Sequence, residues 1–515
     1  MSVARGAIAI AVAACASLGA ARSAAQEAPR PATSRAAPTS VGTAAGAASP
    51  WAALRAGIDS LLDDPSFANA HWGVVIVDPA RGDTLYSRNA GKLFMPASNQ
   101  KLLTGAVALT RLGAAHRWTT VLAAGGRLRN GTLAGDLLVA GSGDPSMSDA
   151  MRGDVRAAFD SLARALRDRG VRRVTGRLVH RGDAMPGDVY GFGWAHDDFG
   201  EAYSAPIDEL TLNEGLARIV VRGTTVAHAA RVEVFPVAGA VRVISRVRTI
   251  SLPAAGRDAP RIEMVDGAYV VQGTLRRGDS AVFPVAIREP GRAWLLALRA
   301  ALARQGVRVQ GGLARDTMPM TARDTLLVWH SPTLAEVLPW VEKPSQNQLA
   351  ELLFRSLGAA FDSAGTERAG RRVVTAQLAQ WGIDSTRVAV RDGSGLSRHD
   401  YVAPEAIVRV LDVMWRGRDS AVFRSALPVA GIDGTLERRM RGTAAQGRVQ
   451  AKTGFVDKAR SLSGYVTTAG GATLIFSMMS NNWTTPVRSV ERVQDAIAVR
   501  LAQLPLAALA DADRR

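Results

Sequence analysis

The distribution of helical and extended patterns along this chain of 515 residues limits its possible folds more than any other feature. Residues 51–149 and 311–505 mix amphipathic helices with strands, whereas residues 150–310 consist mainly of short strands separated by Pro-Gly and Arg-Gly-Asp turns. One sheet assembled from both ends of the chain, with a β-rich insert between them, accounts for this pattern. We therefore predict an α+β fold in which an antiparallel sheet is flanked by helices.

The segments expected to form this sheet lie near the two ends of the globular region. Trp51–Leu62 has apolar residues at helical spacing, and His71–Val77 and Asp83–Ser87 follow it as predicted strands. Three strand-like runs and a helix are expected at the other end: Gly447–Val456, Ser461–Thr468, Thr473–Met479 and Val487–Leu504.

The first 25 residues have the pattern of a secretory signal peptide. Arg5 precedes an apolar run from Ala7 to Ala14 that is too short to span a bilayer, and small residues follow as far as Ala25. The alternative is lipoprotein processing, which would place a lipid anchor at Cys15, the only cysteine of the chain. We predict an exported protein of the periplasm or cell envelope and favour the soluble form over the anchored one.

Two further segments are predicted to lie outside the folded domains. Residues 26–50 are rich in Ala, Pro, Ser, Thr and Gly without periodicity, which indicates a flexible linker. Residues 506–515 are expected to form a tail. No later stretch is long and apolar enough for a transmembrane helix.

The formal net charge of +17 comes almost entirely from scattered arginines. No basic run is interleaved with aromatic residues, so we do not expect nucleic acid as the partner. An arginine-rich solvated surface explains the charge, and attraction to an anionic polymer such as cell wall is the functional alternative. Because the seven histidines are scattered and no His/Cys cluster exists, we expect no metal and no cofactor.

The stretch Met95–Thr104 carries the first candidate for catalysis. It is predicted to be helical, and residues three apart on a helix share a face, so the Lys101 amine can reach the Ser98 hydroxyl. A serine becomes a strong nucleophile when a neighbouring base takes its proton, and lysine can act as that base once burial lowers its pKa. The Ser-x-x-Lys pattern alone is a weak signal, because it also occurs on ordinary surface helices.

The scarcity of lysine strengthens this candidate. Only five of the 63 basic residues are lysine, so arginine supplies nearly all the ordinary surface charge. A remaining lysine is then a candidate for a group whose pKa must shift, which a guanidinium cannot do. We expect Lys92 and Lys458 to be surface charges and Lys343 to be solvated.

Two weaker patterns lie downstream. Ser345 and Asn347 supply a hydroxyl and an amide at a break between two predicted helices, where side chains can face a cleft. Lys452-Thr453-Gly454 is the only Lys-Thr-Gly of the chain and lies on a predicted strand, which can present a cation, a hydroxyl and backbone N–H groups to an extended substrate. We expect Gly454 to leave room for that approach.

Ser-x-x-Lys, Ser-x-Asn and Lys-Thr-Gly in this order resemble the active-site set of the penicillin-binding protein and serine β-lactamase superfamily. The wide separation of Ser98 from Ser345, with a β-rich insert between them, is similar to the D-alanyl-D-alanine carboxypeptidase/endopeptidase family of class C low-molecular-mass penicillin-binding proteins, the S13 peptidases. Other stretches resemble the same family: Gly141-Ser-Gly-Asp-Pro145, Tyr203-Ser-Ala-Pro206, Asp392-Gly-Ser-Gly-Leu-Ser397, Leu427-Pro-Val-Ala-Gly431 and Gly434-Thr-Leu436.

The resemblance implies a role for each motif residue. Ser98 would attack the carbonyl between two D-alanines, with Lys101 as general base, and Ser345 would relay the proton to the leaving amine. The substrate would be bound by the remaining residues, Asn347, Lys452, Thr453, Gly454 and Phe455. The N–H groups of Ser98 and Phe455 would form the oxyanion hole.

The resemblance also implies the fold and the partners. The domain of residues 51–149 and 311–505 would be a transpeptidase-like penicillin-binding catalytic domain with a helical subdomain, and residues 150–310 would be inserted β-rich modules. Peptidoglycan stem peptides would be the substrate, and β-lactam antibiotics would be covalent inhibitors. One departure is Gln346, where the family commonly has Asp.

Two alternatives remain open at this point. A β-lactamase would use the first and third motifs, but the long insert argues against it. A non-catalytic wall-binding protein on the same scaffold is the second alternative. The sequence does not decide whether an enzyme of this kind trims stem peptides or cuts the cross-links between them.

Overall fold

A computed structural model describes residues 51–251, 259–320 and 325–507 of the chain. The predicted signal peptide, the predicted linker and Cys15 lie outside the described residues, as does the tail beyond residue 507. Among the helices that are described, none combines the length and the apolar character needed to cross a membrane.

The helices begin and end as follows: α1 (Ala52–Leu62), α2 (Gln100–Arg111), α3 (Asp149–Arg152), α4 (Val155–Asp168), α5 (Pro290–Arg304), α6 (Leu334–Glu342), α7 (Asn347–Phe361), α8 (Glu367–Gln380), α9 (Pro404–Arg416), α10 (Ser420–Ala426) and α11 (Val487–Gln503). A short 3₁₀ turn, η2 (Ala97–Asn99), precedes α2 directly.

The strands are β1 (His71–Asp78), β2 (Asp83–Arg88), β3 (Thr119–Arg129), β4 (Thr132–Gly141), β5 (Arg173–Val174), β6 (Leu178–Arg181), β7 (Leu216–Arg222), β8 (Arg231–Phe235), β9 (Val243–Ile250), β10 (Arg261–Val265), β11 (Ala268–Arg276), β12 (Ser280–Ala286), β13 (Arg308–Val309), β14 (Leu313–Asp316), β15 (Thr325–His330), β16 (Val388–Ala389), β17 (Tyr401–Val402), β18 (Val449–Val456), β19 (Ala459–Thr467) and β20 (Thr473–Asn481).

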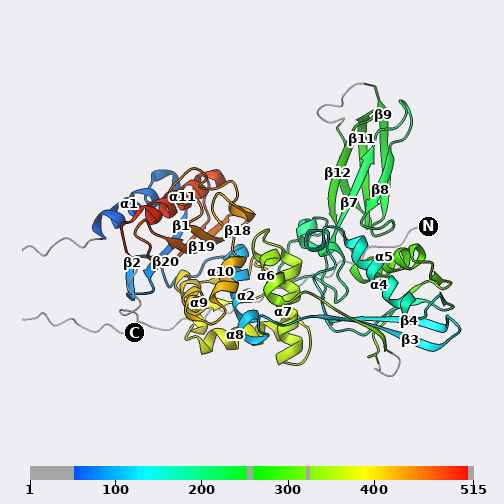
Figure 1. Ribbon diagram of the computed structural model, residues 1–515. Coiled ribbons are helices and arrows are strands. Elements are labelled where there is room, and N and C mark those ends of the chain that lie inside the picture. Colours follow the sequence, from blue (N-terminus) through cyan, green and yellow to red (C-terminus); the bar gives the residue numbers. More distant parts are fainter. Residues whose placement is uncertain (1–50, 252–258, 321–324, 508–515) are drawn as a thin grey trace, which may run out of the picture. The chain divides into compact units, whose positions relative to one another are not determined.

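One five-stranded sheet joins the two ends of the globular region, as predicted (Figure 1). Its strand order is β18-β19-β20-β1-β2, and every neighbouring pair is antiparallel. The register between β1 and β20 runs from His71 opposite Asn481 to Val77 opposite Ile475. This pairing places β18, with the Lys-Thr-Gly motif, in the same sheet as the strands that lead into α2.

Both faces of this sheet are buried. Alternate residues of a strand point to opposite faces, and in β1 Val74 and Ile76 join a core with α1 and α11, whereas Val75 joins a core with α2 and α9. In Figure 1, α1 and α11 lie on one side of the sheet and α9 on the other. The fold is therefore a sheet between two helical layers, as the predicted α+β class requires.

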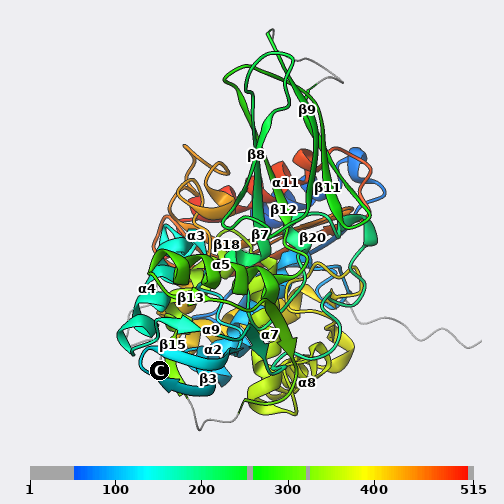
Figure 2. The same ribbon diagram turned by 90° about the vertical axis from the view of Figure 1, so that its right-hand side faces the viewer.

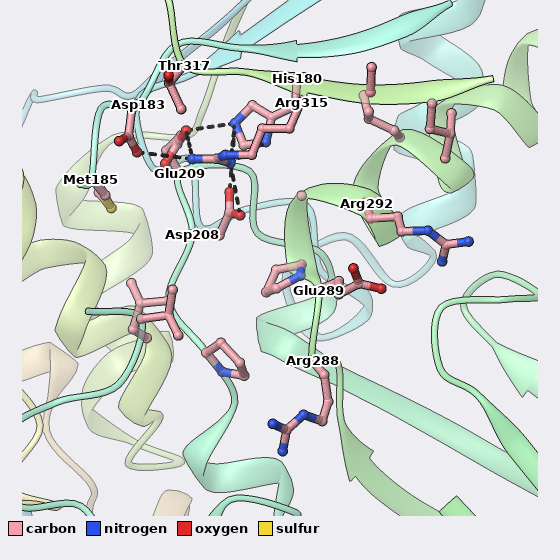
Figure 3. A pocket seen from close by; sticks show the side chains of 18 of the residues that line it. His180, Asp183, Met185, Asp208, Glu209, Arg288, Glu289, Arg292, Arg315 and Thr317 are labelled. Atoms are coloured by element: carbon pink, nitrogen blue, oxygen red, sulfur yellow. Dashed lines mark hydrogen bonds and ion pairs between the residues drawn. The ribbon is translucent and has the colours of Figure 1, made fainter. Parts of the chain in front are cut away.

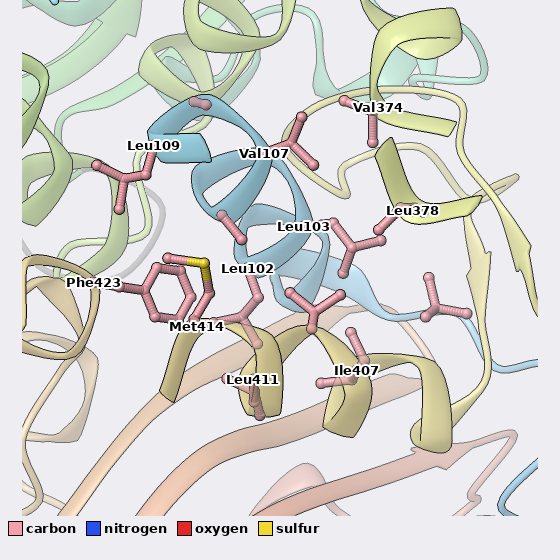
Figure 4. Close-up of a cluster of buried hydrophobic side chains, with 14 of the residues drawn as sticks. Leu102, Leu103, Val107, Leu109, Val374, Leu378, Ile407, Leu411, Met414 and Phe423 are labelled. Atoms are coloured by element: carbon pink, nitrogen blue, oxygen red, sulfur yellow. The ribbon is translucent and has the colours of Figure 1, made fainter. Parts of the chain in front are cut away.

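Helix α2 lies in the centre of the second core (Figure 4). Every residue from Gln100 to Leu109 is buried. Its apolar side chains contact residues of α8, α9 and α10, including Leu378, Leu411 and Phe423. A fully buried Leu stabilises a fold by about 1.5–3 kcal/mol, so this packing holds the helix that carries Lys101 rigidly in place.

The β-rich region contains three further sheets (Figures 1 and 2). Seven strands form the largest, namely β3–β6 and β13–β15. The other two have the strand orders β10-β11-β9 and β12-β7-β8. These sheets share a core with α4 and α5, in which Phe159 contacts Trp294 edge to face. The largest sheet takes strands from both sides of residues 150 and 310, so the precise limits of the inserted region stay a prediction.

Candidate active site

The turn that carries Ser98 is strained and is tied to the sheet. Ala97, directly before it, has φ of +47°, a left-handed conformation that costs an L-residue about 1–2 kcal/mol. Two contacts hold the turn: the Ser461 hydroxyl donates to the Pro96 carbonyl at 2.6 Å, and Asn99 Nδ2 donates to the Lys452 carbonyl at 3.1 Å. The strands β18 and β19 therefore position the serine directly.

Lys101 lies fully buried beside Ser98, as the spacing predicts. Its Nζ is 2.9 Å from Ser98 Oγ, 2.7 Å from Asn347 Oδ1 and 2.7 Å from the Ser394 carbonyl. An ammonium has three hydrogens to donate, and three acceptors surround this one. The two acceptors other than Ser98 hold the nitrogen in place whether or not the serine hydroxyl donates to it.

Burial changes the acidity of this lysine. It lowers the pKa of Lys101 to about 8, although nearby carboxylates, Glu342 first among them, oppose the effect. Near neutral pH the amine therefore exchanges its proton far more readily than a surface lysine does. A neutral amine 2.9 Å from a hydroxyl can accept the proton of that hydroxyl.

A second Ser–Lys pair faces the first across the site. Lys452 Nζ donates to Ser345 Oγ at 2.8 Å and to the Thr453 carbonyl at 2.9 Å. Burial, and then the charge of Lys101, hold the pKa of Lys452 well below its ordinary value. The Thr453 hydroxyl donates to Thr435 Oγ1 at 2.7 Å. The strand therefore presents its cation toward Ser345 of the second motif and its hydroxyl toward Thr435, in the segment before β18.

Gly454 is needed where β18 crosses the serine turn. A Cβ atom at this position would lie 2.1 Å from Ser461 Oγ, 2.6 Å from the Pro96 carbonyl oxygen and 3.1 Å from the backbone nitrogen of Ser98. From the sequence, the glycine was expected to leave room for the approach of a substrate. The structure supplies a different reason, which is the close contact between the strand and the turn.

Replacing Gly454 by Ala is expected to lower the free energy of unfolding by about 1–3 kcal/mol, the usual cost of overpacking a tight site. Urea unfolding followed by tryptophan fluorescence measures this change. Gly312→Ala is the matched control, because its Cβ would have no heavy atom within 4 Å. Equal stability of G454A and G312A would contradict the contact.

The motif residues surround one cleft. Ser98, Ser345, Asn347 and Phe455 line a cavity of about 810 Å³, with Tyr203 as part of its wall. Lys101, Lys452 and Thr453 are buried behind this lining. The structure thus brings together residues that lie up to 357 positions apart, as the predicted site requires.

Asn347 and Gln346 have structural partners as well. Asn347 lies at the start of α7, where its Nδ2 donates to the Tyr203 carbonyl at 2.8 Å while its Oδ1 accepts from Lys101. Gln346 Oε1 accepts from the backbone nitrogen of Gln348 at 2.9 Å and so caps α7. An aspartate at 346 could provide the same cap, which explains why a glutamine is tolerated there.

The prediction that Lys343 is solvated is wrong. Its Nζ donates to Asp433 Oδ2 at 2.6 Å and to the Leu427 carbonyl at 3.0 Å, and the side chain is about a quarter exposed. These bonds join the segment before Ser345 to the loop that precedes β18. Lys92 and Lys458 are exposed, as predicted.

Two groups at the site were missed by the motif reasoning. The Ser394 carbonyl accepts from Lys101, within a turn in which Asp392 accepts from the backbone nitrogens of Gly395 and Ser397 at 2.6 and 2.8 Å. Glu342 lies fully buried at the end of α6. The Asp392–Ser397 stretch was noted only for its resemblance and its glycines, and nothing in the sequence distinguishes Glu342 from an ordinary helix residue.

A second pocket, of about 520 Å³, lies in the β-rich region (Figure 3). His180, Asp208 and Glu209 place ligand atoms within 4.8 Å of one another, a spacing that a metal ion could use. Arg315 already lies against all three: its Nη1 is 2.8 Å from His180 Nδ1 and 3.5 Å from Asp208 Oδ2, and its Nη2 is 3.5 Å from Glu209 Oε1. Its guanidinium supplies the positive charge that these carboxylates require, so the group is explained as a partly buried ion-pair network.

Comparison with known proteins gives consistent matches over nearly the whole globular region. Residues 54–504 match the D-Ala-D-Ala carboxypeptidase 3 (S13) family. The D-alanyl-D-alanine carboxypeptidase of Actinomadura sp. (strain R39) is 34% identical over 468 residues, which cover 87% of this chain and 84% of the relative. The D-alanyl-D-alanine carboxypeptidase DacB of Haemophilus influenzae is 27% identical over 418 residues, 77% of this chain and 82% of the relative.

Solved structures show the same fold. The crystal structure of penicillin binding protein 4 (dacB) from Haemophilus influenzae has a TM-score of 0.75 and 23% identity, and the match covers 87% of this chain and 99% of that one. The same protein complexed with a β-lactam has a TM-score of 0.69, again with 23% identity and coverage of 87% and 99%.

Proposed function

This chain belongs to the D-Ala-D-Ala carboxypeptidase 3 (S13) family, and from that premise we propose that it is a serine-type D-Ala-D-Ala carboxypeptidase acting on peptidoglycan stem peptides. The observation that carries the proposal is the Ser98–Lys101 pair, which lies 2.9 Å apart at a cleft that also contains Ser345 and is backed by Lys452. A nucleophile, a base and an anion-binding cation in one cleft are the groups that acyl transfer requires.

In the first step the Ser98 oxygen forms a bond with the carbonyl carbon between the two D-alanines, and Lys101 takes the hydroxyl proton. The peptide C–N bond then breaks, and Ser345 relays a proton from Lys452 to the leaving amine, across the 2.8 Å contact between those two side chains. The products are free D-alanine and an acyl-enzyme, which water hydrolyses in the second step. No step draws on a metal or a cofactor.

The oxyanion of each tetrahedral intermediate is bound by the backbone N–H groups of Ser98 and Phe455. Two features support this assignment: both residues line the cleft, and β18 is an edge strand, so alternate N–H groups point away from β19. Each such donor contributes about 3–4 kcal/mol to transition-state stabilisation.

Substrate binding falls to the remaining motif residues. The terminal carboxylate of the peptide lies against Lys452 and Thr453, since a cation and a hydroxyl together bind carboxylates well. Asn347 lines the cleft and contacts the substrate peptide while it holds Lys101. Gly454 has no side chain, so β18 can lie against the serine turn without displacing it.

The test is the reaction of the purified protein with fluorescent penicillin and with muropeptides. We expect one equivalent of penicillin to bind covalently, the adduct to be found by mass spectrometry on the peptide containing Ser98, and D-alanine to be released from pentapeptide stems. The products released from cross-linked muropeptide dimers show whether the enzyme is also an endopeptidase. Rapid hydrolysis of penicillin would instead favour a β-lactamase, and absence of any adduct would favour a non-catalytic protein.

The location is part of the proposal. An enzyme that acts on peptidoglycan must leave the cytoplasm, which fits the signal-peptide pattern of residues 1–25. We propose export to the periplasm or cell envelope, in soluble form, with a lipid anchor at Cys15 as the alternative. Intact-mass analysis of the mature protein distinguishes a chain that begins after Ala25 from one that begins at a lipid-modified Cys15.

A further inference from the structure

Glu342 is a buried carboxyl group to which the proposed reaction gives no role. It is the last residue of α6, it has no exposed surface, and it lies three positions before Ser345. Neither of its carboxyl oxygens has a hydrogen-bond partner within the described part of the chain. A buried carboxyl group without hydrogen bonds is costly, so its presence at this position calls for an explanation.

The side chain of Glu342 lies against α2, the helix that carries Lys101. Its Oε1 lies 2.9 Å from the position that a Cβ of Gly105 would occupy, so the carboxyl group rests against α2 where that helix has no side chain. Gly105 is one turn beyond Lys101, and residues four apart share a helix face. The positive charges of Lys452 and Lys101 both lower the pKa of Glu342, and the charge of Lys452 has the larger effect.

The proposed reaction places opposite demands on these two lysines. Lys101 must be neutral to take the proton of Ser98, whereas Lys452 must be a cation to bind a carboxylate and to supply a proton through Ser345. Both amines are fully buried, and the charge of Lys101 adds to the burial that favours the neutral form of Lys452. Without a nearby carboxylate, Lys452 would lose its proton under the conditions in which Lys101 becomes a base.

We propose that Glu342 is a positioning residue whose carboxylate keeps Lys452 protonated while Lys101 is neutral. The inference rests on the proposed function, because it assigns a task to a group at that same site. The acyl-transfer chemistry takes place without contact between Glu342 and the substrate.

Other charged groups also shift the pKa values of the two lysines. Three carboxylates raise the pKa of Lys101, namely Asp392, Glu351 and Asp400, and the charge of Arg460 lowers the pKa of Lys452. These three carboxyl groups already accept backbone hydrogen bonds that shape the turn after β16: Glu351 from Gly393 and Ser394, Asp392 from Gly395 and Ser397, and Asp400 from Arg391. Glu342 has no such structural bond, so its replacement changes the charge and little else.

The sign of the expected effect follows from the loss of one negative charge. The pKa of Glu342 is raised by burial to about 7, so the wild-type carboxyl is ionised above that pH and neutral below it. In Glu342→Gln the pKa values of both lysines fall, and that of Lys452 falls more. The rising and falling limbs of kcat/KM against pH should both move to lower pH, by about one unit or more for the falling limb.

The experiment measures kcat/KM and KM for a D-Ala-D-Ala peptide from pH 5 to pH 10. Concentrations are taken from titration with penicillin, so that only folded enzyme is counted. Below pH 7, E342Q should match the wild type. Above pH 7 its KM should rise with pH, by about tenfold for each pH unit beyond the falling limb, because Lys452, the cation that binds the carboxylate, has lost its proton. Glu342→Asp, which keeps the carboxylate, should restore most of the wild-type profile.

Two further variants make the outcome decisive. Glu342→Met is also neutral and suits an apolar site, so it replaces E342Q if the amide fails to fold. Glu336→Gln is the matched control on the same helix, where the side chain is exposed and caps the N-terminus. If the rising and falling limbs of kcat/KM in E342Q or E342M lie at the same pH values as in the wild type, the inference is overturned, even if kcat/KM is lower at every pH. A wild-type protein that never reacts with penicillin would instead overturn the proposed function.

Discussion

Replacing Ser98 by alanine is expected to abolish covalent labelling by fluorescent penicillin, while leaving the fold intact. The hydroxyl oxygen is the atom that forms the bond, so no slower route to the adduct remains. Stability should change by less than about 0.5 kcal/mol, the usual range at partly exposed sites, because Ser98 is partly exposed and Lys101 keeps its bonds to Asn347 and Ser394. Gel fluorescence measures the labelling, and thermal unfolding measures the stability.

Ser345→Ala is the comparison that makes this result specific. The cleft contains two Ser–Lys pairs of nearly equal length, 2.9 Å for Ser98–Lys101 and 2.8 Å for Ser345–Lys452, so distance alone does not choose the nucleophile. Each serine lies two residues before the first residue of a helix, α2 or α7, so the helix dipole does not choose between them either. Ser98 is favoured by its place in the Ser-x-x-Lys motif. S345A should still be labelled, but more slowly. Labelling of S98A together with loss of labelling in S345A would reverse the assignment.

The sheet built from both ends of the chain was predictable for a physical reason. Its central strands are buried on both faces, so they appear in the sequence as continuous apolar runs such as Val74–Val77 and Leu474–Phe476. Helices α8, α9 and α10 were not predicted. The limits of the β-rich region were also not determined, because β4 pairs in parallel with β5 and β6 across a helix, and such long-range pairing leaves no local pattern.

The site was predictable where its chemistry resides in side chains at fixed spacing. Ser98 and Lys101 are adjacent because a helical turn makes them so, and Lys452 could be singled out because lysine is rare in this chain. The Ser394 carbonyl was not predictable, since every residue has such an oxygen and only the fold selects one. Lys343 was misjudged because its partner, Asp433, lies 90 residues further along the chain.

Replacing Lys101 by methionine is expected to slow acylation by penicillin about a thousandfold, within the range that positioned general bases contribute. The nucleophile remains, so slow labelling should persist, in contrast to S98A. Lys92→Met is the matched control, because Lys92 is an exposed lysine outside the cleft. Stopped-flow or gel-based rates of adduct formation measure the effect. A rate within tenfold of the wild type would show that another group takes the proton.

The pH dependence of the same variant tests the reason for the loss. Since the pKa of Lys101 is lowered to about 8, wild-type acylation should rise between pH 7 and pH 9 as the amine becomes neutral, and K101M should lack that rise. The free energy of unfolding should also depend on pH through Lys101. A lysine whose folded-state pKa is depressed binds fewer protons when folded than when unfolded, so the wild type gains stability as pH rises from about 8 to the ordinary lysine value of 10.5. K101M carries no such group, and urea unfolding at pH 7 and pH 10 should show a smaller gain in stability with pH than in the wild type.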